Sequence, residues 1–155
     1  MSLNPGEQAP DFTLPTNGGG TVTLSALRGR PVVLYFYPKD DTSGCTAEAC
    51  AFRDAFPDFS APGAVVIGVS RDSVSSHDRF KAKHGLPFPL AADVDGTVCA
   101  AYGVWKEKSM YGRKYMGIER STFLIGPDGA IRGLWRKVKV PGHAAEVLKA
   151  VRGLQ

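Results

Sequence analysis

Continuous apolar runs in the first half of the chain predict strands that are covered on both faces. Residues 32–37 form an unbroken run of β-branched and aromatic residues that stops at Pro38, and residues 64–69 form a second run. Such runs are typical of central strands in a sheet with helices on both sides. Two later runs, at 121–125 and 130–135, flank a Gly-Pro-Asp-Gly turn and predict an antiparallel hairpin.

Between the first two runs, apolar residues recur at helical spacing. The phenylalanines of residues 52–59 predict a helix that begins near Ser43 or Gly44, with Thr42 or Ser43 as its N-cap. Because proline removes a backbone donor, Pro57 is expected to end the first regular stretch of this helix.

Three further helices follow from capping signals and periodicity. The second helix is predicted to run up to Lys83, with Asp72 or Ser73 as its N-cap. A short helix is expected to open at residues 95–96, and a last helix is expected over residues 143–151, where apolar residues fall on one face.

The order of these elements predicts an α/β fold. The glycines of residues 18–20 predict an N-terminal hairpin, whereas residues 105–118 show no clear periodicity and are expected to form a loop. Strands and helices alternate through the middle of the chain, and the late hairpin makes the sheet mixed. We therefore expect one domain over residues 1–155, with a thioredoxin-like, three-layer arrangement of a mixed central sheet flanked by helices on both faces.

Composition narrows the class of protein without naming a function. The 155 residues are 43% hydrophobic and 22% charged, close to the average of globular domains. The chain has no apolar run of about 18 residues and no N-terminal basic region followed by an apolar stretch, so neither a membrane span nor a secretory signal is expected. The net charge of +4 is mild and its positive residues are scattered, which does not predict a nucleic-acid partner.

The three cysteines are the first chemical signal. An odd and low number favours a reducing, cytoplasmic setting over a disulfide-stapled secreted scaffold. Cys45 lies where a buried strand gives way to a helix. The first turn of a helix has free backbone N–H groups and a partial positive charge, and both favour the thiolate, which is the nucleophilic form.

The residues around Cys45 resemble a known family. Pro38, Thr42 and Cys45 form the pattern Pro-x-x-x-Thr-x-x-Cys, which resembles the active-site signature of peroxiredoxins, and residues 36–50 resemble the bacterioferritin-comigratory, or peroxiredoxin Q, group. Ser43 is a departure, because that group often has proline there. The resemblance extends over nearly the whole chain, through residues 6–12, 68–70, 102–104 and 120–125.

This resemblance implies a role for each residue of the signature. Cys45 would be the peroxidatic cysteine, whose thiolate attacks a hydroperoxide and becomes a sulfenic acid. Arg120 would stabilise the thiolate and the charge on the leaving oxygen, and Pro38 would shield the sulfur. Thr42, Gly44, Cys45 and Arg120 would bind the substrate, and no metal or organic cofactor would be needed.

Cys50 would be the resolving cysteine that closes a disulfide onto Cys45. Two positions five apart in an intact helix have Cα atoms roughly 8.5–9 Å apart, beyond the limit of about 7 Å for a disulfide. The disulfide therefore requires part of the helix to unwind. The resemblance further implies a peroxidase for hydrogen peroxide and organic hydroperoxides, reduced by thioredoxin or glutaredoxin, which is a monomer or a weak dimer.

Several residues carry simpler interpretations beside the functional ones. Cys50 could pack within a helix, and Cys99 is better explained as a core residue than as a partner of Cys45 or of a second chain. Glu48 could cap the helix dipole or hold the active-site loop by a hydrogen bond. The three histidines, His77, His84 and His143, are interpreted as surface or capping residues. Trp105 and Trp135 are interpreted as packing and pocket-wall residues.

Two other functions remain open from the sequence. A thioredoxin-like disulfide reductase requires Cys-x-x-Cys, whereas four residues separate Cys45 from Cys50. A redox-inactive thioredoxin-fold binding module, or a zinc site, is the other alternative. Three cysteines without a second paired cluster do not favour structural zinc.

Overall fold

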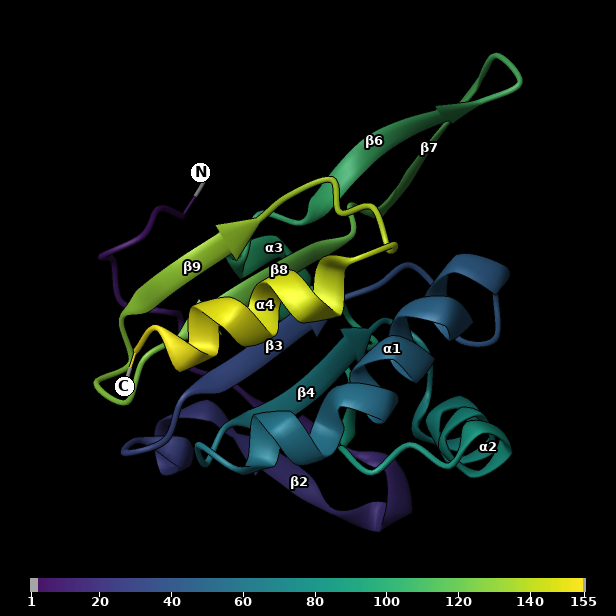
Figure 1. The fold of residues 1–155 in the computed structure, drawn as a ribbon. Coiled ribbons are helices and arrows are strands. Elements are labelled where there is room, and N and C mark those ends of the chain that lie inside the picture. Colours follow the sequence, from purple (N-terminus) through teal and green to yellow (C-terminus); the bar gives the residue numbers. More distant parts are fainter. Residues whose placement is uncertain (1–2, 155) are drawn as a thin grey trace.

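A five-stranded mixed sheet lies at the centre of the computed structural model, which describes residues 3–154 (Figure 1). The strand order is β5-β4-β3-β8-β9. β3 is parallel to β4, and β4 to β5, whereas β8 is antiparallel to β3 and to β9. The bounds are Val32–Phe36 for β3, Val65–Ser70 for β4, Leu90–Ala92 for β5, Ser121–Ile125 for β8 and Ile131–Trp135 for β9.

Helices cover both faces of this sheet, as the sequence predicted. One face carries α1, α2 and α4, and the other carries α3 with the N-terminal hairpin of β1 and β2 (Figure 1). No helix within the described residues is both long and apolar enough to cross a membrane. The remaining bounds are Thr13–Pro15 for β1, Asn17–Gly19 for η1, Thr21–Thr23 for β2, Leu24–Leu27 for η2, Ser43–Ser60 for α1, Val74–His84 for α2, Thr97–Ala101 for α3 and His143–Arg152 for α4.

The central strand β3 explains why its sequence is apolar throughout. Leu34 and Phe36 belong to the core on the α3 side, whereas Val33 and Tyr35 belong to the core beneath α1 and α4. Successive side chains of a strand point to opposite faces, so a strand between two layers buries all of them. Every residue of β3 is buried, and the prediction of a doubly covered strand is confirmed.

The predicted end of the first helix is wrong. α1 continues through Pro57 to Ser60. Proline at this position forfeits the hydrogen bond to the carbonyl of Arg53, but the turn beyond it is held by two other contacts. Phe59 is fully buried in the core, and the Ala61 N–H donates to the Pro57 carbonyl at 3.1 Å. Tertiary packing therefore outweighs the local cost of the proline.

The expected loop over residues 105–118 is also wrong. The segment forms an antiparallel hairpin of β6 (Trp105–Met110) and β7 (Arg113–Ile118), which projects from the body of the molecule (Figure 1). Tyr111 and Gly112 both have positive φ, as a two-residue hairpin turn requires. A projecting ribbon has little buried surface on either face, so its residues do not alternate between apolar and polar.

Candidate active site

Cys45 is the third residue of α1, directly after the loop that follows β3. Its side chain is buried, with 1% of the residue exposed. Thr42 occupies the N-cap position, as predicted, with extended backbone geometry. Its hydroxyl does not cap an α1 N–H, however, and instead donates to the Lys39 carbonyl at 3.0 Å.

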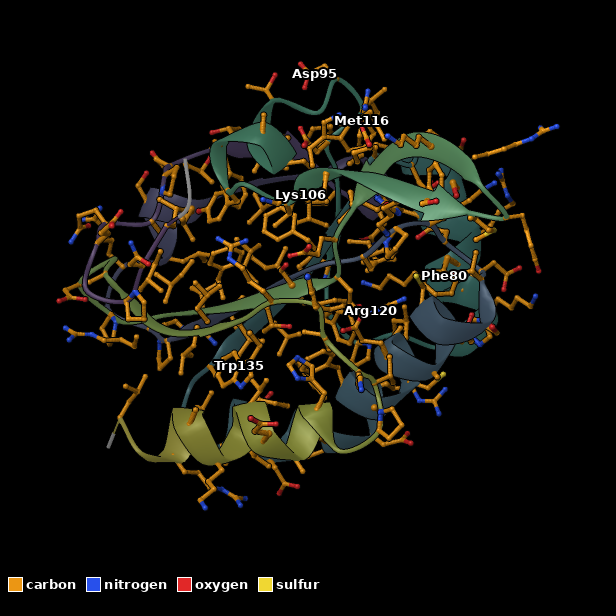
Figure 2. The ribbon with its side chains drawn as sticks, turned by 90° about the horizontal axis from the view of Figure 1, so that it is seen from above. Phe80, Asp95, Lys106, Met116, Arg120 and Trp135 are labelled. Carbon is orange, nitrogen blue, oxygen red and sulfur yellow. The ribbon has the colours of Figure 1, made fainter. Side chains whose placement is uncertain are left out.

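The pairing of β3 with β8 brings Arg120 to Cys45. Phe36 is opposite Ser121 in the antiparallel register, so Arg120 lies beside the point where the chain leaves β3. The Nη2 atom of Arg120 lies 3.3 Å from the Sγ atom of Cys45. Figure 2 shows Arg120 at the end of the sheet where α1 begins. A guanidinium at this distance favours a negative charge on the sulfur.

Glu48 is the second partner of Arg120. Its Oε1 atom accepts a hydrogen bond from Arg120 Nη1 at 2.6 Å, while its Oε2 atom has no hydrogen-bond partner among residues 3–154. Burial raises the pKa of the Glu48 carboxyl to about 7, although the charge of Arg120 acts in the opposite direction. Glu48 lies beyond the first turn of α1 and is paired with Arg120, so its interpretation as a cap of the helix dipole is wrong.

Arg120 keeps its positive charge in this setting. Burial alone would lower the pKa of Arg120, but the neighbouring Glu48 and Cys45 groups raise it above its ordinary value. Gly44 makes room for the guanidinium, because a Cβ atom there would lie only 3.2 Å from Arg120 Nη2. The glycine therefore serves the close approach of the cation to the start of α1.

Pro38 and Thr42 lie on the side of the active-site loop that faces solvent. Both line a cavity of about 650 Å³, whose opposite wall is the hairpin of β6 and β7. Cys45 and Arg120 are not part of the cavity lining, so the cavity lies next to the buried sulfur and does not contain it. The structure thus brings Pro38, Thr42, Gly44, Cys45 and Arg120 together around one loop.

His77 is a residue of this region that the sequence interpretation placed wrongly on the surface. It is fully buried, and its Nδ1 atom lies 2.7 Å from Asp40 Oδ2 while its Nε2 atom lies 3.0 Å from the Ala91 carbonyl. The Tyr37 hydroxyl donates to the other Asp40 oxygen at 2.6 Å. Spacing could have revealed this: His77 lies three residues before the buried Phe80, on the same face of α2.

Asp40 fixes the loop between β3 and α1 to α2. Burial would raise the pKa of Asp40, but hydrogen bonds from His77, Tyr37 and Ser76 bring it below its ordinary value. The anchored carboxylate therefore stays charged, and it holds the backbone a few residues before Cys45.

The other two histidines differ from one another. His143 is buried at the start of α4, where its Nε2 atom and the Thr122 hydroxyl are 2.8 Å apart, so the surface interpretation is wrong for it as well. Burial lowers the pKa of His143. His84 is half-buried at the C-terminal end of α2, where a capping residue was expected.

The remaining cysteines and tryptophans lie in distinct environments. Cys50 is half-buried on α1, and Cys99 is fully buried on α3, as expected of a core residue. All three cysteines are free thiols. Trp105 lines the cavity and packs beneath the Arg71 guanidinium, whereas the Trp135 indole donates to Glu146. Among residues 3–154 no group of three or more His, Cys, Asp or Glu side chains is arranged to hold a metal ion.

The fold and the cysteine-arginine site define a class of thiol-dependent peroxidase. The chain belongs to the AhpC/TSA family, which matches residues 5–134. Its relatives include a putative peroxiredoxin bcp of Coxiella burnetii, 55% identical over 148 residues that cover 96% of this chain and 98% of the relative. Peroxiredoxin Bcp of Bacillus subtilis is 50% identical, over 99% of this chain and 98% of its own.

Similar solved structures also belong to peroxiredoxins of this kind. The bacterioferritin comigratory protein of Xanthomonas campestris, studied for alkyl peroxide reduction, is 51% identical with a TM-score of 0.88, over 92% of this chain and 90% of that one. A cysteine mutant of Xylella fastidiosa PrxQ is 47% identical with a TM-score of 0.93, over 99% and 98% of the two chains. The chain is thus a peroxiredoxin-type, thiol-dependent peroxidase with a thioredoxin fold, as the signature around Cys45 predicted.

Proposed function

We propose that Cys45 is the peroxidatic cysteine of this enzyme. Its thiolate attacks the terminal oxygen of a hydroperoxide, so an S–O bond forms while the O–O bond breaks. The sulfur is oxidised to a sulfenic acid, and the leaving oxygen takes up a proton and departs as water or an alcohol. The single observation that carries this proposal is the Arg120 guanidinium 3.3 Å from the buried Cys45 sulfur.

Arg120 stabilises negative charge both on the attacking sulfur and on the leaving oxygen. Its charge favours the thiolate in the resting enzyme and opposes the negative charge that develops on the leaving oxygen. Glu48 binds the other arm of the guanidinium and so fixes its orientation. The bidentate use of one planar group is the reason that arginine, and not lysine, suits this position.

The neighbouring residues bind and orient the peroxide. Because the Thr42 hydroxyl donates its hydrogen to the Lys39 carbonyl, its oxygen is free to accept a hydrogen bond from the hydroperoxide O–H. The backbone N–H of Cys45 belongs to the first turn of α1 and lacks an earlier helical partner. Gly44 admits Arg120, and Pro38 shields the sulfur from water.

Cys50 resolves the sulfenic acid by forming a disulfide with Cys45, and water is released. Both residues lie within α1, so the intact helix holds them too far apart for a disulfide. Residues 43–50 therefore unwind. Phe52 and Phe59, which are fully buried, keep the remainder of α1 on the sheet.

Recycling requires an external dithiol. The unwound segment exposes the disulfide, and thioredoxin or glutaredoxin reduces it by thiol-disulfide exchange. Hydrogen peroxide and organic hydroperoxides are the proposed substrates. The enzyme acts as a monomer, or as a weak dimer, in the cytoplasm, where a chain with three free thiols remains reduced.

Mass spectrometry of the cysteines after one equivalent of hydrogen peroxide tests this proposal. The expected product is a Cys45–Cys50 disulfide with Cys99 still alkylatable after unfolding. In Cys50→Ser, Cys45 should stop at the sulfenic acid, which a dimedone probe labels, and reduction by thioredoxin should be lost. A disulfide to Cys99, or an unmodified Cys45, would contradict the assignment.

Hydrogen exchange tests the unwinding independently. We expect the amides of residues 43–50 to be protected in the reduced enzyme and to exchange at least about tenfold faster in the disulfide form. Amides of β3 serve as the control and should not change. Equal protection of α1 in both redox states would mean that the disulfide forms without melting the helix.

A further inference from the structure

The cavity beside the active-site loop has walls of two kinds. One wall is the loop itself, with Pro38 and Thr42. The other is the hairpin of β6 and β7, which supplies an apolar and aromatic surface from Trp105, Met110, Tyr115, Met116 and Ile118. In Figure 2 this hairpin, labelled at Lys106 and Met116, lies above Arg120 in the view. A cavity of about 650 Å³ is large enough for an organic molecule with an apolar body.

The charged residues of this cavity all have the same sign. Lys39, Arg71 and Lys108 line it, and among the described residues no aspartate or glutamate does. Arg71 is already engaged, because it donates to the Val94 carbonyl and covers the Trp105 ring at 4.5 Å. Lys39 is exposed, whereas Lys108 is half-buried. Among these three cations, Lys108 is therefore the one that is both partly buried and without a side-chain partner in the described residues.

Lys108 lies on β6 and lines the cavity beside the active-site loop. Its register partner is Tyr115, and its aliphatic chain crosses the space above Gly117, where a Cβ atom would lie 3.3 Å from the Lys108 Cδ atom. Within residues 3–154 the Lys108 ammonium forms no salt bridge or side-chain hydrogen bond. A Cβ atom at Gly117 would crowd this aliphatic chain, so the glycine leaves room for Lys108 to lie against the ribbon.

The charges of the active-site residues Arg120 and Cys45 act on the pKa of Lys108. Burial lowers the pKa of Lys108, and the positive charge of Arg120 lowers it further, while Cys45 acts in the opposite direction. A bound anion would offset the repulsion between these two cations. Lys114 on the neighbouring strand differs, because it is highly exposed and already lies 3.7 Å from Glu107.

We propose that Lys108 is a specificity-determining residue, which selects organic hydroperoxides that carry a carboxylate by binding that carboxylate in the cavity while the apolar body lies against the hairpin. The inference rests on the proposed function of Cys45 and leaves its chemistry unchanged. The O–O bond still breaks at Cys45, and the product is the corresponding alcohol, with its carboxylate intact.

A matched pair of substrates tests this inference. One is cumene hydroperoxide bearing a para-carboxylate, and the other is the methyl ester of the same acid, which adds one methyl group and removes the charge. The readout is the ratio of the second-order rate constants for Cys45 oxidation, acid over ester, by rapid quench and mass spectrometry. In the wild type this ratio should exceed one, and an ionic strength of about 1 M should bring it down.

Three variants separate the role of Lys108 from general electrostatics. Lys108→Gln should lower the acid-to-ester ratio roughly fivefold to tenfold, as expected for one partly buried ion pair. Lys108→Arg keeps the charge and should retain most of the preference. Lys114→Gln removes a charge from the same hairpin outside the cavity and should leave the ratio as in the wild type.

The outcomes distinguish this inference from the proposed function. An unchanged ratio in Lys108→Gln, or an equal fall in Lys114→Gln, would overturn the role of Lys108 while the peroxidase assignment stands. If neither hydroperoxide nor hydrogen peroxide oxidised Cys45 in the wild type, the proposed function itself would fail. A preference that falls only with Lys108→Gln supports the inference.

Discussion

Two cysteines of this chain occupy the same position in a helix and have opposite surroundings. Cys45 is the third residue of α1, and Cys99 is the third residue of α3. Both are almost fully buried, at 1% and 0% exposure. Each follows a strand and a short loop, so position and burial alone do not separate a reactive thiol from an inert one.

The neighbouring charge separates them. Cys45 faces the Arg120 guanidinium, whereas the backbone N–H of Cys99 donates to the Asp93 carboxylate at 2.7 Å. Burial and the adjacent Asp93 both raise the pKa of Cys99, which keeps it a thiol. α3 also has only five residues, so its dipole is short. A helix N-terminus therefore yields a thiolate only where the neighbouring side chains also favour a negative charge on the sulfur.

The largest expected effect comes from replacing Cys45 by serine, and the same replacement at Cys99 is the comparison. Cys45→Ser should lower peroxide turnover by at least about a thousandfold, because the nucleophile is removed. Cys99→Ser should leave turnover within about threefold of the wild type, since a serine hydroxyl fits beside Asp93. Hydrogen peroxide consumption with dithiothreitol as reductant measures both. Comparable losses in the two variants would erase the distinction between these sites.

The next effect comes from the charge beside each thiol. Arg120→Met should slow the single-turnover oxidation of Cys45 by about 10²–10³-fold, the range seen when one preorganised donor is lost. Arg120→Lys should recover only part of this rate, because one point charge cannot bind Cys45 and Glu48 together. Asp93→Asn is the matched change at the other thiol and should leave the rate unaltered. A normal rate in Arg120→Met would refute the electrostatic explanation.

The smallest effect concerns Glu48, the carboxyl that shares Arg120 with Cys45. Its pKa is about 7 in the folded protein against an ordinary value of 4.5, so between these values the folded state holds a proton that the unfolded state releases. Stability of the reduced enzyme should therefore fall by roughly 1–3 kcal/mol as pH rises from about 4.5 to about 7. Urea unfolding across this range measures the slope.

Two variants identify the source of that slope. Glu48→Gln should flatten it, whereas Glu107→Gln, which changes an exposed carboxylate on the hairpin, should reproduce the wild type. A slope that survives in Glu48→Gln would assign the pH dependence to other groups. A slope that disappears would show that the Glu48–Arg120 pair is assembled at a cost that grows as the carboxyl ionises.

Local patterns predicted most of the fold and failed where long-range contacts decide. The doubly buried β3, the Ser73 cap of α2 and the late hairpin follow from short-range signals, and each is present. The continuation of α1 through Pro57 depends on the burial of Phe59 in a distant core. The burial of His77 depends on Asp40, which lies far away in the chain.

The sequence by itself determined the reactive motif, because Pro38, Thr42 and Cys45 lie within one strand-loop-helix turn and their spacing is local. The family resemblance around residues 120–125 already implied that Arg120 serves Cys45, but only the tertiary structure decided how the two groups meet. The antiparallel pairing of β3 with β8 carries Arg120 across 75 residues to Cys45, and the unpredicted hairpin brings Lys108 to the adjoining cavity. Charges act through space, so the distances that set reactivity exist only once the chain has folded.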